Sequence, residues 1–384
     1  MRRKICVVST GRSDYGLLLW PMREIQNTTG LELQTVVTGM HLAREYGMTV
    51  NRFADDGFPV SKRVEMLLSG DSAQAISKSL GLAIIGFSDA FELLRPDIVL
   101  LLGDRFEIFA AAQAALVARI PVAHLFGGDT TEGAFDEAFR HSITKMSHLH
   151  FVSNKLSGQR VVQLGENPEN VHVVGATGLD AIQKATFFKR KDFFGRINFV
   201  PRKKNILLTF HPVTLGKRSS GEDFFELLEA LDELGNDYGL IFTRPNADTE
   251  GGILNGMLNR FVESHCNAKA YEVLGENYLN ALKHVDAVVG NSSSGIYEVP
   301  SFGIATVNIG DRQKGRLEAA SVINCPAEKE AIIQAIHRAL REDFVGTKNP
   351  YGDGRASERI IQVLTTIQRP EELLQKHFFM TGVA

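Results

Sequence analysis

The chain has 384 residues, a formal net charge of -3 at pH 7, 44% hydrophobic residues and 23% charged residues. This length is more than one hydrophobic core usually serves, so two domains are expected. The composition is that of an ordinary globular protein, and the net charge gives no sign of the basic surface by which proteins bind nucleic acids or anionic membranes, although local basic pockets are compatible with it. Neither of these is therefore an expected partner.

The N-terminus combines a basic start, residues 1–4, with only four apolar residues, 5–8, before polar residues follow. This run is too short for a signal peptide, and no run approaches the roughly 18 apolar residues that a membrane span needs. Cys6, Cys266 and Cys325 are far apart and form no CxxC pair, which argues against a disulfide framework or a zinc site. A cytoplasmic location is expected.

Short β-branched runs alternate with amphipathic segments along the chain. In the first half, the predicted strands cover residues 5–9, 33–37, 98–102, 122–125, 150–152 and 171–174. In the second half, they cover residues 206–210, 239–243, 270–273, 287–289 and 305–308. Continuous apolar strands separated by helices are typical of parallel sheets covered on both faces. The pattern predicts an α/β fold with two doubly wound, Rossmann-like domains facing a cleft.

Residues 185–204, between the two halves, are basic, aromatic and poorly periodic, as a connection between domains would be. We therefore expect one Rossmann-like domain over residues 1–185 and a second over residues 200–365. Residues 355–363 have a helical pattern, and Pro370 favours the start of another short helix. The last segment, residues 366–384, is expected to pack as a helix on the N-terminal domain.

Charged and hydroxylated residues follow the predicted strands, at the ends where doubly wound folds bind ligands. A chain that only needed turns would use Asn, Gly and Pro there, whereas this chain also places Arg, Asp and His. The segments are 11–14, 103–105, 126–129, 211–212, 244–246, 291–293 and 310–312.

The segment 290–298, GNSSSGIYE, is the most informative of these polar stretches. A Gly/Ser-rich turn that opens a helix leaves backbone N–H groups unpaired, with the positive end of the helix dipole behind them, and so attracts phosphate. Glu298 is placed to accept the two hydroxyls of a ribose. A plain turn with an N-cap would use similar residues. Together with the other strand ends, however, the segment favours a nucleotide diphosphate with its sugar attached.

Seven ordered motifs make the chain similar to a known family. They are residues 11–15 (GRSDY), 37–41 (VTGMH), 103–105 (GDR), 136–145 (DEAFRHSITK), 211–214 (HPVT), 290–295 (GNSSSG) and 308–313 (NIGDRQ). With these motifs the chain resembles the UDP-N-acetylglucosamine 2-epimerase family, most of all its hydrolysing branch in bacterial sialic-acid and legionaminic-acid biosynthesis. The resemblance extends from residue 5 to about residue 342.

The resemblance implies a glycosyltransferase-B-like architecture, a UDP-sugar substrate and a homodimer, with the nucleotide bound by the C-terminal domain. Uridine and ribose contacts are then expected at Arg12, Ser292, Ser293, Glu298 and Arg312, with His211 near the diphosphate. Further substrate contacts are expected at Asp14, His41, Arg105 and Asn246. Cations and backbone donors suit a diphosphate leaving group as its charge develops. No Walker motif, HExxH metal site or nucleophile elbow occurs in the sequence, so neither a metal nor another cofactor is expected.

The resemblance also implies a reaction. The C2 proton of the sugar is removed, UDP departs from C1, and water adds to the resulting 2-acetamidoglucal to give free N-acetylmannosamine. Positioned carboxylates suit the acid and base roles, because proton transfer must be coupled to C1–O cleavage. The candidate catalytic residues are Asp104, Asp129, Glu132, Asp136, Arg140 and His211. An ion pair of Asp104 with Arg105, or of Asp136 with Arg140 at i and i+4, would be a structural alternative.

One position departs from the family pattern. Several hydrolysing members carry His-Ile-Glu-Gly-Gly-Glu, whereas residues 124–129 are HLFGGD, so Phe126 stands where a catalytic carboxylate has been proposed. Because Phe126 cannot transfer a proton, either Asp129, Glu132 or Asp136 is expected to do so, or the family's assignment of that role is not general. A more apolar pocket would suit UDP-2,4-diacetamido-2,4,6-trideoxyglucose as an alternative to UDP-N-acetylglucosamine. A non-hydrolysing 2-epimerase, a glycosyltransferase of the same architecture or an inactive nucleotide-sugar binding module would also be compatible with these motifs.

Overall fold

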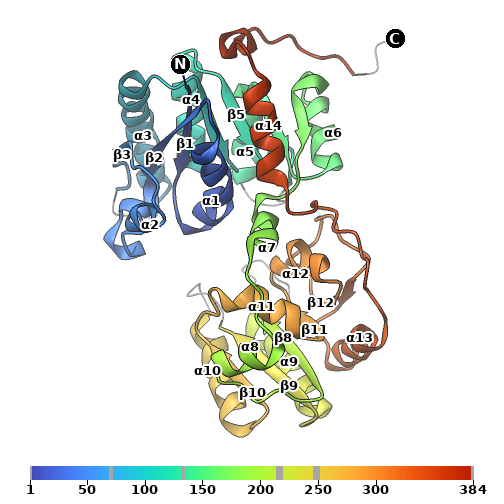
Figure 1. Ribbon diagram of the computed structural model, residues 1–384. Helices are drawn as coiled ribbons and strands as arrows, with labels where there is room; N and C mark the ends of the chain where they lie inside the picture. Colours follow the sequence, from blue (N-terminus) through green and yellow to red (C-terminus); the bar gives the residue numbers. More distant parts are fainter. Residues whose placement is uncertain (1, 69–71, 131–134, 213–218, 245–250, 382–384) are drawn as a thin grey trace. The chain divides into compact units, whose positions relative to one another are not determined.

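The computed structural model describes residues 2–68, 72–130, 135–212, 219–244 and 251–381. The chain forms two compact units, the first from residues 1–183 and 351–384 and the second from residues 184–350. Each unit contains one parallel sheet with helices on both faces (Figure 1). This confirms the predicted α/β fold class. In the part of the chain that the structure describes, no helix is both long and apolar enough to cross a membrane.

The sheet of the first unit has seven strands in the order β3-β2-β1-β4-β5-β6-β7. The strands are β1 (Arg3–Ser9), β2 (Leu31–Thr38), β3 (Lys62–Val64), β4 (Ile98–Leu102), β5 (Val122–Leu125), β6 (Leu149–Val152) and β7 (Val171–Val173). The helices that start in this unit are α1 (Arg12–Asn27), α2 (Asn51–Asp55), α3 (Ala73–Leu94), α4 (Phe106–Val117), α5 (Asp136–Met146), α6 (Lys155–Gln163), α7 (Asp180–Lys184) and α14 (Ala356–Thr366).

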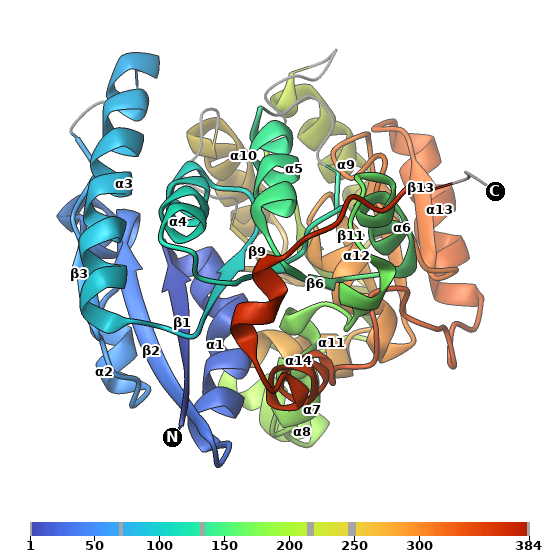
Figure 2. The same ribbon diagram turned by 90° about the horizontal axis from the view of Figure 1, so that it is seen from above.

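Both faces of this sheet are buried, because successive side chains of a strand point to opposite faces. In β1, Ile5 and Val7 belong to the core on the side of α1 and α14. Cys6 and Val8 belong to the core on the side of α3 and α4. Figure 2 shows the two helix layers on either side of the strands. A strand buried on both faces needs apolar residues at every position, which explains the unbroken apolar runs in the sequence.

Helix α14 corrects the expected domain boundary, because it belongs to the first unit and not to a domain spanning residues 200–365. Its Ala356, Ile360 and Leu364 are buried in the same core as Leu18 of α1. The carboxylate of Asp180 accepts hydrogen bonds from the N–H groups of Ala356 and Ser357, 2.8 and 2.7 Å away, and so fixes the start of α14. Periodicity reveals the apolar face of a helix but not the core that covers it.

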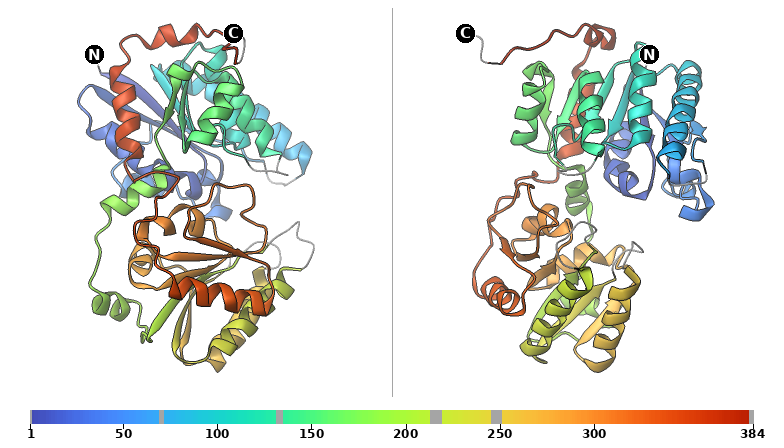
Figure 3. Two further views of the ribbon diagram at one scale, coloured as in Figure 1. Left: turned by 90° about the vertical axis from the view of Figure 1, so that its right-hand side faces the viewer. Right: turned by 180° about the vertical axis from the view of Figure 1, so that it is seen from behind.

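The segment after α14 is less helical than expected. It contains the 3₁₀ helix η6 (Pro370–Leu374), with Pro370 in its first turn, and no α-helix among the described residues 367–381. It remains part of the first unit (Figure 3).

The second unit contains a six-stranded parallel sheet in the order β10-β9-β8-β11-β12-β13. Its strands are β8 (Lys204–Thr209), β9 (Tyr238–Thr243), β10 (Ala268–Tyr271), β11 (Ala287–Gly290), β12 (Ala305–Ile309) and β13 (Val322–Cys325). Its helices are α8 (Arg190–Arg196), α9 (Ser220–Leu234), α10 (Gly251–Ser264), α11 (Asn277–His284), α12 (Ser294–Tyr297) and α13 (Lys329–Arg341). Leu208 packs on the side of α9, α10 and α13, whereas Leu207 packs on the side of α8 and α11.

The sequence did not predict β3 and β13. Both are edge strands, and both are short. Strand β3 includes Lys62 and Arg63, and β13 includes Asn324, so neither has the continuous apolar run of a central strand. Edge strands are exposed along one side and tolerate such residues.

Candidate active site

The carboxyl edge of the first sheet gathers several of the predicted residues. Strands β2, β1, β4 and β5 are neighbours in this sheet and run in parallel, so the segments that follow them lie along one edge. Helix α5 adds Asp136 and Arg140.

Two candidate catalytic residues are joined by an ion pair, in which Arg140 Nη2 contacts the Asp104 carboxylate. Arg140 is buried, at 8% exposure. Asp136, one turn earlier on α5, forms no ion pair with a described residue, so the i,i+4 pair that the sequence left open is absent. Burial, and then repulsion from Asp104, raise the pKa of Asp136. A carboxyl group with a raised pKa and no cationic partner is suited to proton transfer.

Two predicted substrate contacts, His41 and Asp14, are buried side chains. His41 has no exposed surface. Its Nε2 lies 2.9 Å from Ser9 Oγ, and its Nδ1 lies 2.7 Å from Thr49 Oγ1. Asp14, 4% exposed, accepts hydrogen bonds from the N–H and the hydroxyl of Thr10 at 2.6 and 2.9 Å. The polar atoms of both side chains form hydrogen bonds inside the fold, at the ends of β1 and β2.

The Asp129 side chain also forms hydrogen bonds within the protein. Its carboxylate accepts hydrogen bonds from the hydroxyls of Ser153, at 2.8 Å, and Ser157, at the start of α6. Burial raises the pKa of Asp129, and these two bonds oppose the rise. These contacts connect Asp129 to β6 and to the start of α6.

Phe126 directly follows β5 and has a backbone conformation that is uncommon for its type. Its φ angle is 65°, in the left-handed region that costs a non-glycine residue about 1 kcal/mol or more. The ring is partly buried against the core shared with α1. The neighbouring His124 is fully buried, with Nε2 2.8 Å from the Gly103 carbonyl, and burial lowers its pKa to about 3. His124 is therefore neutral and structural.

The remaining predicted residues of the first unit differ in their surroundings. Arg12 is exposed at the first position of α1. Arg105 binds Glu107, which sequence reasoning missed, because an acidic residue in the first turn of a helix is common. Glu132 lies outside the described residues, as does Asn246 of the second unit.

In the second unit, Asn291 organises the segment after β11. Its side-chain oxygen accepts the N–H of His211 at 2.7 Å, and its side-chain nitrogen donates to the His211 carbonyl at 2.8 Å. Its own carbonyl accepts bonds from Arg312 Nη1 at 3.1 Å and Gln313 Nε2 at 2.8 Å. Asn291 thus brings together three segments that the sequence singled out, although it was not itself predicted as a site residue.

The helix expected after this segment is only one turn long. Helix α12 covers Ser294–Tyr297, Glu298 follows it, and the 3₁₀ helix η5 (Val299–Phe302) begins next. Pro300 explains the break, because proline lacks an N–H and disfavours a helical residue before it. One turn supplies little dipole, so a phosphate near Ser292 and Ser293 would depend on backbone N–H groups more than the sequence suggested.

Glu298 has the environment of a hydroxyl-binding carboxyl group. Its Oε2 is buried and has no hydrogen-bond partner among the described residues. Burial raises the pKa of Glu298 to about 7. The nearby Tyr278 hydroxyl contacts Ser294. A buried acceptor without a donor is costly unless a ligand or solvent supplies one, and the two hydroxyls of a ribose would do so.

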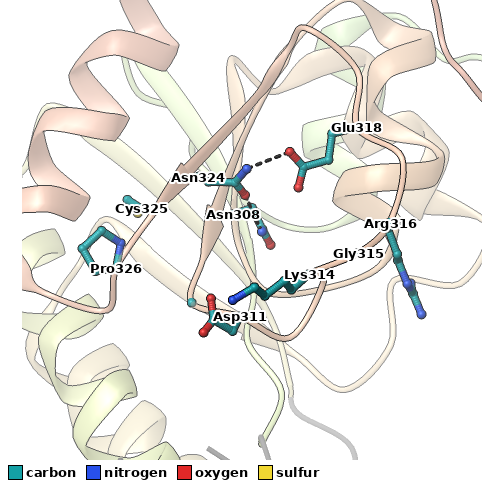
Figure 4. Close-up of a pocket in the computed structure, with 10 residues that line it drawn as sticks. Asn308, Asp311, Lys314, Gly315, Arg316, Glu318, Asn324, Cys325 and Pro326 are labelled. Atoms are coloured by element: carbon teal, nitrogen blue, oxygen red, sulfur yellow. Dashed lines mark hydrogen bonds between the residues drawn. The ribbon is translucent and has the colours of Figure 1, made fainter. Parts of the chain in front are cut away.

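A cavity of 540 Å³ lies at the carboxyl ends of β12 and β13 (Figure 4). Asn308 donates to Asn324 at 2.7 Å, and Asn324 donates to Glu318 at 2.7 Å, which fixes one wall. The lining also includes Lys314 and Arg316, next to the loop position of Arg312. The positive charges of Lys314 and Arg316 are balanced by the carboxylates of Glu318 and Asp311, so the cavity by itself does not select an anionic ligand.

A family model described as UDP-N-acetylglucosamine 2-epimerase matches residues 23–365. A Campylobacter jejuni protein named GDP/UDP-N,N'-diacetylbacillosamine 2-epimerase (hydrolyzing) is 40% identical over 345 residues, covering 89% of each chain. A Legionella pneumophila protein named UDP-N,N'-diacetylbacillosamine 2-epimerase (hydrolyzing) is 37% identical, covering 98% of this chain and 99% of its own. These comparisons cover both units.

A solved structure gives the same result for the fold. The crystal structure of UDP-GlcNAc 2-epimerase from Neisseria meningitidis bound to UDP-GlcNAc superposes with a TM-score of 0.76. The match covers 95% of this chain and 100% of the other, at 19% identity. The architecture is thus the glycosyltransferase-B-like one that the sequence resemblance implied.

Proposed function

This chain belongs to the UDP-N-acetylglucosamine 2-epimerase family, and from that premise we propose that it is a hydrolysing 2-epimerase of a UDP-linked 2-acetamido sugar. The observation that carries the proposal is Asp136, a carboxyl group without an ion-pair partner among the described residues, beside the ion pair of Asp104 and Arg140. The names of the two relatives support hydrolysis as the outcome.

The proposed reaction begins at C2 of the sugar. Asp136 takes the C2 proton, the C2–H electron pair forms the C1=C2 bond, and the C1–O electron pair leaves with UDP. Water then adds its oxygen to C1, and a proton returns to C2 from the opposite face. We assign the proton transfers to the group of Asp136, Asp104 and Arg140, because C2 is weakly acidic and needs a positioned base.

The nucleotide is assigned to the second unit. Ser292, Ser293 and Arg312 are proposed to bind the diphosphate with the His211 segment, and Glu298 the ribose hydroxyls. Hydrogen-bond donors and a guanidinium stabilise the charge that develops on departing UDP. Arg12 is proposed as a further substrate contact.

Two sugars are proposed as substrates. UDP-N,N'-diacetylbacillosamine, the 2,4-diacetamido-2,4,6-trideoxyglucose nucleotide, is supported by the names of both relatives and by the apolar side chain of Phe126. UDP-N-acetylglucosamine is supported by the description of the family. The products would be UDP with the free N-acetylated manno-configured sugar.

Proton NMR in deuterated water, with each UDP-sugar in turn, tests the proposal. Equal amounts of UDP and free 2-epimerised sugar, with deuterium at C2, are expected. Release of the epimerised UDP-sugar would indicate a non-hydrolysing enzyme, and binding without turnover of either nucleotide would indicate a binding module.

We also propose the homodimer that the resemblance implies, which light scattering on the purified protein would test.

A further inference from the structure

Glu107, the second residue of α4, is a carboxylate without exposed surface. It accepts two hydrogen bonds from the Arg105 guanidinium, with Nε 3.2 Å from Oε2 and Nη2 3.1 Å from Oε1. Next to it lies Gly39, the residue directly after β2, whose φ is +58°. A Cβ at this position would lie 2.9 Å from Glu107 Oε1. The carboxylate is thus confined by backbone on one side and binds the guanidinium on the other.

Arg105 is fixed by this contact and is still accessible. Its side chain is 36% exposed, in contrast to the fully buried Glu107. Its Nη1 forms no hydrogen bond with the residues that the structure describes. Burial raises the pKa of Glu107, and the Arg105 charge opposes the rise, so the carboxylate depends on its partner to remain ionised.

The charges around Asp136 follow a simple pairing. Two cations act on it, Arg105 from the start of α4 and Arg140 from α5 itself. Arg105 is bound by Glu107, and Arg140 is bound by Asp104. Asp136 is left as the carboxyl group without a cation of its own among the described residues.

Other titratable groups face this cluster from neighbouring elements. Asp14 of α1 acts electrostatically on both Arg105 and Glu107. On α5, His141 Nε2 lies 3.4 Å from Glu137 Oε1. The buried His124 of β5 is close enough to Arg140 for the Arg140 charge to lower its pKa. None of these groups supplies a cation to Asp136.

We propose that Glu107 is a positioning residue of this site, which holds the Arg105 guanidinium so that it does not pair with Asp136. The inference rests on the proposed function, because it assigns to Glu107 the task of keeping Asp136 free for proton exchange with the substrate. Without an anion at position 107, the carboxylates that remain near the guanidinium are Asp14, which already accepts two hydrogen bonds from Thr10, and Asp136. The pair of Arg105 and Glu107 adds no net charge, so Arg105 can donate hydrogen bonds without neutralising the base.

The variant Glu107→Gln tests this, because it keeps the shape and removes the charge. An opposite charge close to a carboxyl group lowers its pKa by about 1 unit or more. The acid limb of the pH profile for UDP release is therefore expected to move about 1 unit toward lower pH. In the double variant Glu107→Gln/Arg105→Gln both charges are absent, and the limb is expected to return to its wild-type position.

A second readout does not depend on turnover. Carboxyl ¹³C NMR of the full chain, with the Asp136 signal assigned through Asp136→Asn, follows the titration of Asp136 in each variant. The same shift in Glu107→Gln, and the same return in the double variant, are expected. If Glu107→Gln fails to fold, Glu107→Asp keeps the charge but moves it back by one methylene, and a smaller shift in the same direction is expected.

An unchanged Asp136 titration in a folded Glu107→Gln or Glu107→Asp protein would overturn the inference, even if activity falls. A shift that persists in the double variant would also overturn it, since the effect would then not act through Arg105. If the wild-type protein releases UDP from neither sugar, the proposed function fails, while the NMR titration still decides whether Glu107 controls Asp136.

Discussion

At the scale of single residues, Glu298 differs from the other candidates in its buried oxygen. Oε2 has no partner among the described residues, and burial raises the pKa of this carboxyl group to about 7. Near neutral pH the group is thus partly protonated before a ligand binds. A ribose that donates two hydrogen bonds favours the ionised form, so ligand binding and proton release are coupled.

We expect Glu298→Gln to weaken uridine binding by about 1.5–3 kcal/mol, the usual contribution of hydrogen bonds to a charged group. Calorimetry with uridine measures this without interference from phosphate titration. In the wild-type protein, affinity should rise as the pH increases from 6 to 8, and the variant should lose this dependence. Glu263→Gln, exposed on α10, is the control, and equal losses in both variants would contradict the assignment.

Asp136 is the residue on which the proposed chemistry depends most. Asp136→Asn keeps the size of the side chain but removes the base, so the rate of UDP release should fall by about 10²–10⁴. Uridine affinity should stay within about twofold, because the nucleotide is assigned to the second unit. Asp89→Asn, exposed on α3, is the matched control. A loss below tenfold would indicate that another carboxylate removes the proton.

At the scale of elements, the carboxyl end of α5 is held by the segment that follows η6. Lys376 Nζ donates to the carbonyls of Lys145 and Ser147 at 2.9 and 2.6 Å, and pairs with the Glu166 carboxylate at 2.6 Å. Glu166 also binds His150 Nε2 at 3.0 Å. Because α5 carries Asp136 and Arg140, this distant segment stabilises the helix on which the candidate site depends.

Lys376→Met should therefore destabilise the first unit. The change leaves two carbonyls without their donor and removes one cation from a buried carboxylate, at a cost of about 2–3 kcal/mol. Urea denaturation followed by circular dichroism measures the loss. Lys155→Met, at the exposed first position of α6, should change stability by less than about 0.5 kcal/mol. Equal midpoints for the two variants would show that Lys376 contributes nothing.

At the scale of the whole molecule, the two units differ in how the chain builds them. The second is continuous over residues 184–350, whereas the first needs residues 351–384 in addition to residues 1–183. Helix α14 supplies Ala356, Ile360 and Leu364 to the first core. Burial of these three side chains contributes roughly 5 kcal/mol, comparable to the whole stability of a typical domain.

Truncation after residue 350 should consequently unfold the first unit alone. Scanning calorimetry of the truncated chain should lose the transition of the first unit and keep that of the second. Uridine should still stabilise the remaining transition, because Glu298 and Arg312 are retained. A truncated protein with both transitions intact would show that α14 is dispensable to the first core.

The central strands were predictable because their burial on both faces requires continuous apolar runs, as in β1 and β4. The edge strands β3 and β13 lack this requirement and were not recognised. Strand β10 begins two residues before its predicted start, at Ala268, because an edge strand has no sharp apolar boundary.

The sequence by itself determined the fold class, the family and the segments at which polar residues follow strands. These depend on local patterns: apolar periodicity, glycine and proline at turns, and ordered motifs. Only the tertiary structure decided which of those polar side chains face inward. The side chains of His41 and Asp14 form hydrogen bonds with Ser9 and Thr10. Asp136 forms no ion pair among the described residues, because the two arginines that act on it are bound by Glu107 and Asp104. The pairing of charges depends on distances between segments far apart in the chain, which no local pattern records.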